Sequence, residues 1–317
     1  MLNRDALGID TSNYTTSAAR LTGDEVSQNK RLLTVREGEG GLRQNDAVFQ
    51  HVRQLPDVLS PFLQNAQGIS AIGVSDRPRD AEGSYMPCFL VGMGTARVLS
   101  ETLGVPLYCF SHQAGHIAAA LYSIGRLDLL EAPFLAFHVS GGTTEAVRVV
   151  PGGARLFTAE RVASSLDLKA GQAVDRCGLL LGLPFPAGPA LEALAVRWQE
   201  PVRVRAVLRG ADCSLSGIEN QCRALAASGA PRELVARYCL EAIRAALEGM
   251  CAALLRQYGT LPVVFAGGVA SNSILREALS EKYGAQFASP AFSADNAAGL
   301  AVLAGIAAEK GDAYEWE

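Results

Sequence analysis

Leu7-Gly-Ile-Asp-Thr-Ser-Asn-Tyr-Thr-Thr16 is an apolar strand that runs into a polar turn, and Thr15 to Leu21 continues it as a second strand. The second half of the chain holds a matching hairpin, in which strand-like runs at 134–139 and 145–150 flank the turn Ser140-Gly-Gly-Thr-Thr144. Helix-like and strand-like runs alternate after each hairpin, so the order β-β-β-α-β-α occurs twice. This duplication predicts an α/β fold of two similar lobes that face a central cleft.

The spacing of apolar residues predicts where the remaining elements lie. We expect strands at 31–35, 69–74, 106–110 and 261–265, and helices at 46–63, 89–103, 170–181, 189–198 and 233–258, with another from Ser271 and a last one at 295–309. The lobe boundary is expected near 111–132, which gives an N-terminal lobe of residues 1–111 and a C-terminal lobe of residues 112–317. The last helix is a candidate to complete the first lobe.

Composition places the chain among soluble globular proteins, because 49% of its 317 residues are hydrophobic and 19% are charged. No apolar run reaches about 18 residues, so no membrane partner is expected. No signal peptide is visible before the first strand, which favours a cytoplasmic location. The net charge of −4 lacks the basic footprint of a dedicated nucleic-acid binder. An RNA substrate would therefore need a local basic patch, such as Arg203 to Arg209, or the help of a partner.

Seven cysteines stand at positions 88, 109, 177, 213, 222, 239 and 251, and no two of them form a CxxC pair. Most of them lie in apolar surroundings. This pattern fits reduced, buried thiols in a cytosolic protein better than a disulfide framework or a zinc knuckle.

Two of the four histidines stand four residues apart in His112-Gln-Ala-Gly-His116, at the start of an apolar, alanine-rich run. If this run is helical, positions i and i+4 lie on one face, about 5–6 Å apart, where two imidazoles can share one metal. A third ligand must come from elsewhere, and Asp295 is an acidic candidate. The alternative is a helix cap with one packed histidine.

Polar turns at strand ends are candidate phosphate sites, because backbone N–H groups can approach an anion where no Cβ intervenes. Asp10 ends the first strand and is a candidate to hold a metal or water beside such phosphates. Gly141 and Gly142 offer the same chemistry in the second hairpin. Gly267 and Gly268 precede a helix, whose N-terminus favours anions. Together these turns predict a nucleotide cleft. Each of them taken alone is also explained as an ordinary turn without a ligand.

Read together, these segments resemble the tRNA threonylcarbamoyladenosine synthase family, formerly called glycoprotease or O-sialoglycoprotein endopeptidase. The similarity runs nearly end to end and in order. The matching segments are Leu7-Gly-Ile-Asp-Thr-Ser12, His112-Gln-Ala-Gly-His116, Val139-Ser-Gly-Gly142, Ala170-Gly-Gln-Ala-Val-Asp175, Pro186-Ala-Gly-Pro189, Ser214-Leu-Ser-Gly217, Ala266-Gly-Gly-Val-Ala-Ser-Asn272 and Asp295-Asn-Ala-Ala298.

The resemblance implies the actin/Hsp70/sugar-kinase (ASKHA) fold and a set of site residues. It implies one divalent metal, iron or zinc, held by His112, His116 and Asp295. It also implies ATP or an acyl-adenylate as ligand, with magnesium as a further candidate. The implied nucleotide-binding residues, with the helix-start glycine added, are Ser140, Gly141, Gly142, Asp175, Gly188, Gly268 and Asn272.

The activity implied by the resemblance is transfer of a threonylcarbamoyl group from its adenylate to an adenosine amine of tRNA. The implied partners are tRNA and either a paralogous subunit or a second copy of the chain. The old protease label has no support, because the sequence contains no HExxH and no nucleophile beside a histidine in a recognisable motif.

The sequence departs from the family where the family carries acids. Tyr14, Thr15, Ala114, Leu168 and Gln172 stand at those positions. The loop at 75–84 also differs and adds Arg77 and Arg79, which either contact an anion or are solvated. We therefore predict a divergent paralogue. Two alternatives stay open: carbamoyl or acyl transfer to another acceptor, and a non-catalytic nucleotide-binding partner subunit, against which the histidine pair argues.

Overall fold

The chain folds into two compact units. The computed structural model describes residues 5–12, 14–35, 42–152, 155–292 and 297–311. The first unit comprises residues 1–130, 151–159 and 294–317, and the second comprises residues 131–150 and 160–293.

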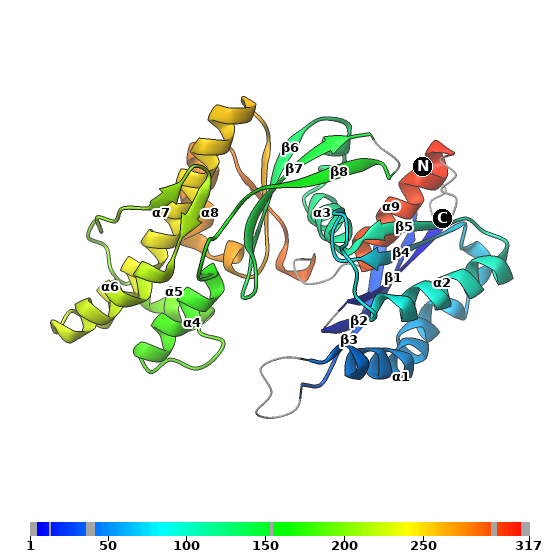
Figure 1. Ribbon diagram of the computed structural model, residues 1–317, viewed down its shortest axis with the longest axis horizontal. Coiled ribbons are helices and arrows are strands. Elements are labelled where there is room, and N and C mark those ends of the chain that lie inside the picture. Colours follow the sequence, from blue (N-terminus) through cyan, green and yellow to red (C-terminus); the bar gives the residue numbers. More distant parts are fainter. Residues whose placement is uncertain (1–4, 13, 36–41, 153–154, 293–296, 312–317) are drawn as a thin grey trace. The chain divides into compact units, whose positions relative to one another are not determined.

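The sheet of the first unit has the strand order β3-β2-β1-β4-β5 (Figure 1). β1 pairs antiparallel with β2 and parallel with β4, which combines a hairpin with a helical crossover in one sheet. The strands are β1 (Asp5–Ser12), β2 (Thr15–Thr22), β3 (Glu25–Leu32), β4 (Ala71–Arg77) and β5 (Leu107–Ser111), and the helices are α1 (Gln44–Leu63), α2 (Phe89–Leu103), α3 (His112–Ser123) and α9 (Ala297–Lys310).

Helices cover both faces of this sheet. Leu7 and Ile9 of β1 belong to the apolar core that includes Leu55 and Val58 of α1. Gly8 lies between them and points to the other face, where a Cβ would lie 2.0 Å from the carbonyl oxygen of Ala297 in α9. Because alternate residues of a strand point to opposite faces, α1 and α9 belong to different layers. The sequence of α9 is apolar on all sides, as is typical of a buried helix.

The second unit repeats this topology in the order β8-β7-β6-β11-β12. β6 pairs antiparallel with β7 and parallel with β11. The strands are β6 (Phe134–Val139), β7 (Thr144–Pro151), β8 (Phe157–Ser164), β11 (Val263–Ala266) and β12 (Gln286–Phe287), with a separate hairpin of β9 (Val207–Arg209) and β10 (Asp212–Ser214). The helices are α4 (Ala170–Leu180), α5 (Gly188–Ala195), α6 (Ser216–Ala227), α7 (Arg232–Tyr258) and α8 (Ser273–Tyr283). The duplicated α/β organisation predicted from the sequence is therefore confirmed.

The strand expected at 31–35 is wrong in position, because β3 spans Glu25–Leu32 and follows directly on the turn at Gly23. β3 is an edge strand whose residues are half-buried or exposed. Such a strand needs no apolar face, so hydrophobic alternation does not reveal it. The edge strand β8 and the helix α6 are also not predicted from the sequence.

No helix in the described part of the chain is both long and apolar enough to cross a bilayer. The longest, α7, has 27 residues but carries charged side chains along its length.

Candidate active site

The histidine pair lies on one face at the start of α3. Ser111 caps this helix, because its hydroxyl oxygen accepts a hydrogen bond from the backbone N–H of Ala114 at 3.1 Å. The ring centroids of His112 and His116 are 4.8 Å apart, with 74° between the ring planes. The helical i, i+4 geometry predicted from the sequence is thus confirmed. The helix cap named in the alternative interpretation is also present, at Ser111.

Asp10, near the end of β1, contacts the first histidine of this pair, His112. Its Oδ1 lies 3.1 Å from Nδ1 of His112 and accepts a hydrogen bond from the hydroxyl of Ser75 at 2.5 Å. The side chain is 1% exposed. Burial acts to raise the pKa of Asp10, but the charge of His112 and these hydrogen bonds outweigh it and hold the pKa below its usual value. Asp10 is therefore a buried carboxylate that fixes the orientation of a histidine.

A second buried histidine, His51, lies near Asp10 and is not predicted from the sequence. His51 of α1 is fully buried, and its Nδ1 lies 2.8 Å from the hydroxyl of Thr16 in β2. Burial lowers the pKa of His51, although the charge of Asp10 and a hydrogen bond to the backbone of Ser12 oppose this effect. A single histidine inside an amphipathic helix gives no sequence signal for such a role.

The residues around the histidine pair fit a divalent metal. His112 and His116 supply imidazole nitrogens, and Asp10 places a carboxylate beside His112. Imidazole nitrogens and carboxylate oxygens suit iron and zinc. The Oδ2 atom of Asp10 is buried and has no hydrogen-bond partner among the described residues. An unsatisfied buried carboxylate oxygen at this place is stabilised by a nearby positive charge. Asp295, the third predicted ligand, lies outside the described residues.

The position of α3 is set by its close contact with α9. A Cβ on Gly299 would lie 1.8 Å from the carbonyl oxygen of Gly115, so only glycine permits this approach. Gly115 lies between the two histidines in sequence, at the point where the backbones of the two helices meet. The packing against α9 therefore fixes the position and rotation of α3, and with them the position of the two histidines.

In the second unit, the predicted nucleotide turn packs against the start of α4. Ser140 accepts a backbone hydrogen bond from Gly171 at 3.2 Å, and a Cβ on Gly171 would lie 2.5 Å from Cα of Gly141. Side chains added at Gly141 and Gly142 would instead meet open space. The backbone of the turn is thus held rigidly but stays accessible to a ligand.

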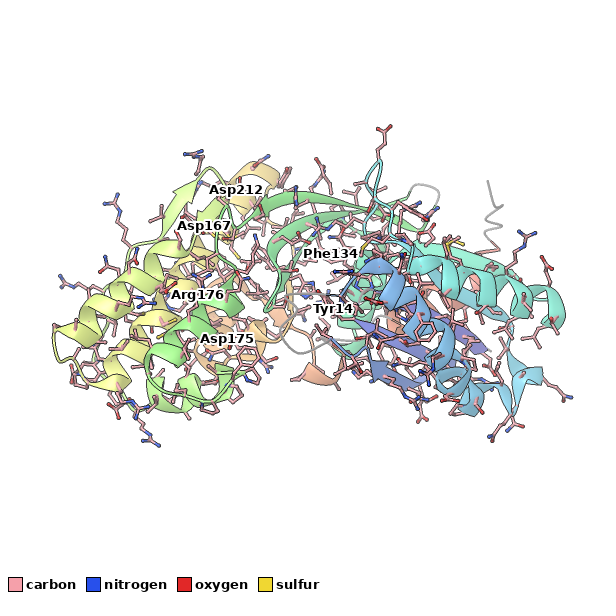
Figure 2. All side chains as sticks on the ribbon, turned by 60° about the horizontal axis from the view of Figure 1, so that its bottom comes forward. Tyr14, Phe134, Asp167, Asp175, Arg176 and Asp212 are labelled. Carbon is pink, nitrogen blue, oxygen red and sulfur yellow. The ribbon has the colours of Figure 1, made fainter. Side chains whose placement is uncertain are left out.

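Asp175 connects α4 to the segment that opens α5. Its Oδ1 accepts a hydrogen bond from the backbone N–H of Ala187 at 2.9 Å, one residue before Gly188. Figure 2 shows Asp175 beside Arg176 on α4. Asp175 lies in the middle of α4, is half-buried, and is hydrogen-bonded to the residue before α5. It is therefore not an ordinary solvated side chain.

Gly268 and Asn272 lie at the end of the neighbouring parallel strand. Ala266 of β11 pairs with His138 of β6, so Gly268 follows β11 on the edge where Ser140 follows β6. The side-chain oxygen of Asn272 accepts from the backbone N–H groups of Ile274 and Leu275 and caps α8. All seven predicted nucleotide-binding residues belong to the second unit.

Asp167 organises a further turn beside α4 and was not among the predicted site residues. It accepts hydrogen bonds from the hydroxyls of Ser214 and Ser216 and from the backbone N–H groups of Leu168 and Leu215. Burial acts to raise the pKa of Asp167, but these hydrogen bonds outweigh it and hold the pKa well below its usual range. Figure 2 shows Asp167 near Asp212. α6 begins at Ser216, directly after this turn.

The positions that depart from the family differ in their surroundings. Tyr14 is 49% exposed in the β1–β2 turn, whereas Ala114 is buried. Arg77, the last residue of β4, pairs with Asp76 at 3.4 Å and with Asp80 at 3.5 Å. Burial raises the pKa of Asp76, and the charges of Arg155 and Arg77 oppose this effect. Arg77 is thus neutralised by neighbouring acids of its own unit.

Solved structures with the same fold have the ASKHA architecture, which confirms the fold class. The (R)-2-hydroxyglutaryl-CoA dehydratase component A from Acidaminococcus fermentans aligns with a TM-score of 0.56 and 18% identity, over 96% of this chain and 99% of that chain. HypF from T. kodakarensis aligns with a TM-score of 0.58 and 14% identity, over 97% of this chain and 48% of that chain. At these identities the similarity concerns the fold alone.

Sequence relatives are transferases. A protein from Thermus thermophilus named tRNA N6-adenosine threonylcarbamoyltransferase is 33% identical over 312 residues, covering 94% of this chain and 91% of the relative. The Bacillus subtilis protein of the same name is 31% identical over 328 residues, covering 96% and 91%. The family model described as tRNA N6-adenosine threonylcarbamoyltransferase matches residues 25–302. The chain therefore belongs to the tRNA N6-adenosine threonylcarbamoyltransferase family.

Proposed function

We propose that this protein transfers a threonylcarbamoyl group from an adenylate to an adenosine amine of tRNA, with one divalent metal held at the histidine pair. The single observation that carries the proposal is the contact of Asp10 with His112, next to His116 on α3. The proposal thus rests on a histidine pair with a buried carboxylate behind it, in a chain that lacks several acids of the family.

The proposed reaction forms one bond and breaks one bond. The adenosine amine attacks the carbonyl carbon of the threonylcarbamoyl adenylate, the C–N bond forms, and the C–O bond to the phosphate breaks. AMP leaves with the electron pair, and the amine gives up one proton. The chemistry supplied by a bound metal is Lewis-acid polarisation of the oxygens of the acyl donor.

We assign the donor set to His112, His116 and Asp295, with iron or zinc as the metal. Asp10 keeps the Nδ1 side of His112 engaged, which leaves Nε2 for coordination. This role makes Asp10 a positioning residue. Its buried charge also stabilises a cation bound at the histidines.

We assign the adenylate to the second unit. Ser140, Gly141 and Gly142 offer backbone N–H groups in a turn with open space above it. Asp175 holds the segment that contains Gly188, and Gly268 and Asn272 border the same sheet edge. The nucleotide is ATP or the acyl-adenylate, and magnesium would accompany its phosphates.

A protein partner is part of the proposal. A groove of about 570 Å³ lies between α1 and α2 and is lined mainly by apolar side chains. Val52, which lines this groove, is more than half exposed, and so are Phe49 of α1 and Val98 of α2. An apolar surface of this kind is typical of a protein–protein contact. A paralogous subunit and a second copy of the chain are the two occupants to compare by size-exclusion chromatography with light scattering.

A second candidate is transfer of the acyl or carbamoyl group to an acceptor other than tRNA. The observation in its favour is the absence of carboxylates at Tyr14, Thr15, Ala114, Leu168 and Gln172, which changes the proton-transfer capacity of the site.

A reconstituted assay distinguishes the two candidates. The protein is incubated with tRNA, threonine, bicarbonate and ATP, together with an adenylate-forming enzyme and partner proteins from a relative. Threonylcarbamoyl-adenosine in the digested tRNA supports the proposed function. Unmodified tRNA, with protein that holds metal and nucleotide, favours another acceptor.

A further inference from the structure

Three cysteines from three different helices meet in the core of the second unit. The Sγ atoms of Cys177 in α4, Cys222 in α6 and Cys239 in α7 all lie within 4.8 Å of one another. The three residues are at most 1% exposed. Among the described residues, no other group of three His, Cys, Asp or Glu side chains brings its ligand atoms so close together.

Hydrogen bonds between the helices hold two of the three thiols in place. The thiol of Cys239 donates to the carbonyl of Ala173 at 3.8 Å, and Ala173 lies one turn before Cys177. The thiol of Cys222 donates to the carbonyl of Val235 at 4.0 Å, one turn before Cys239. Two of the three thiols are thereby tied to a helix that carries another cysteine of the cluster.

The triangle of sulfur atoms has the size of a metal site. Three atoms no more than 4.8 Å apart enclose a point at most about 2.8 Å from each of them, close to the 2.3 Å typical of metal–thiolate bonds. Inward movements of a few tenths of an ångström close the remaining gap. A disulfide between any two of these cysteines would leave the third without a role.

The donor set and its burial select the class of ion. Sulfur ligands prefer soft cations such as Cu(I), whereas zinc requires a fourth ligand. A buried site also disfavours uncompensated charge, so one thiolate with a monovalent cation is the least costly combination.

We propose that Cys177, Cys222 and Cys239 form a binding site for one cuprous ion, separate from the histidine pair. The ion joins α4, α6 and α7 and so braces the helix that carries Asp175. Any thiol that becomes a thiolate on binding releases its proton to solvent.

The test is an anaerobic Cu(I) titration of the full chain against the chromophoric chelator bathocuproine disulfonate. The protein carries His112→Ala and His116→Ala, so that the histidine pair does not contribute. We expect one equivalent of Cu(I) to be withheld from the chelator. X-ray absorption at the copper edge should then show sulfur neighbours at about 2.3 Å.

Cysteine variants made in the same background identify the ligands. Cys222→Ser should weaken binding by more than about 10-fold. Cys251→Ser is the matched control, because Cys251 is also buried on α7 but lies outside the cluster, and it should bind as the parent does. If Cys222→Ser does not fold, Cys177→Ala takes its place. Equal binding by cluster and control variants, or no copper withheld by the parent, overturns the proposal.

Discussion

Asp10 and His112 are 102 residues apart in sequence, yet Oδ1 of one lies 3.1 Å from Nδ1 of the other. Asp10 lies on β1 and His112 follows β5. Both strands run parallel to β4 and end at the same edge of the sheet. α3 begins directly after β5, so its first residue starts at that edge. The contact thus follows from topology, and it places a buried carboxylate behind a candidate metal ligand.

Asp10→Asn should lower metal affinity by about 10- to 100-fold, because it removes the charge that orients and polarises His112. Metal content after dialysis, measured by mass spectrometry, checks this expectation. Asp5→Asn is the matched control, since Asp5 lies on the same strand and pairs with Arg20 instead. Equal metal content in the wild type and Asp10→Asn would contradict the role of Asp10.

Gly299→Ala should destabilise the protein by about 1–3 kcal/mol, because the new Cβ would collide with the carbonyl of Gly115. It should also lower metal affinity, since α3 must shift. Gly94→Ala is the control: Gly94 is also helical but has open space around it, so alanine should be neutral or stabilising by up to about 1 kcal/mol. Chemical denaturation gives both values, and equal midpoints for the two variants would refute the close contact.

Asn272→Ala should weaken adenine-nucleotide binding and cost about 1 kcal/mol of stability, because Asn272 caps α8. Asn272→Ser keeps a capping oxygen and should restore stability. Calorimetric titration with ATP then separates the two effects. If Asn272→Ser and the wild type bind ATP equally while Asn272→Ala binds weakly, the residue acts through the cap; if all three bind equally, it is not at the nucleotide site.

Stability should fall as the pH drops below about 6.5, in part because of His51. Burial depresses its pKa below the ordinary value of 6.5, so the unfolded chain binds more protons in this window and acidification favours unfolding. His51→Gln should flatten the dependence of the unfolding free energy on pH between about pH 7.5 and 5.5. A slope in the variant as steep as that of the wild type would assign the effect to other groups.

Much of the fold is predictable from sequence because the core strands are apolar and the hairpin order is repeated. β6 and α2 lie within the residues expected for them. The edge strand β3 is misplaced, because its environment places no demand on side-chain polarity.

The candidate site is predictable where spacing along one element decides it. His112 and His116 share a helix face, so their proximity follows from helix geometry. The contacts of Asp10 with His112, and of Asp167 with Ser214, depend on which strands and turns become neighbours. Local patterns carry no such information, and the cluster of Cys177, Cys222 and Cys239 escapes notice for the same reason.

The most direct test of the central claim is a single-turnover reaction of purified protein, loaded with metal, with preformed threonylcarbamoyl adenylate and unmodified tRNA. Nucleoside mass spectrometry of the digested tRNA measures the product. We predict threonylcarbamoyl-adenosine with the wild type and its loss with His112→Ala, at unchanged circular dichroism. Unmodified tRNA with the wild type, or undiminished product with His112→Ala, would contradict the account.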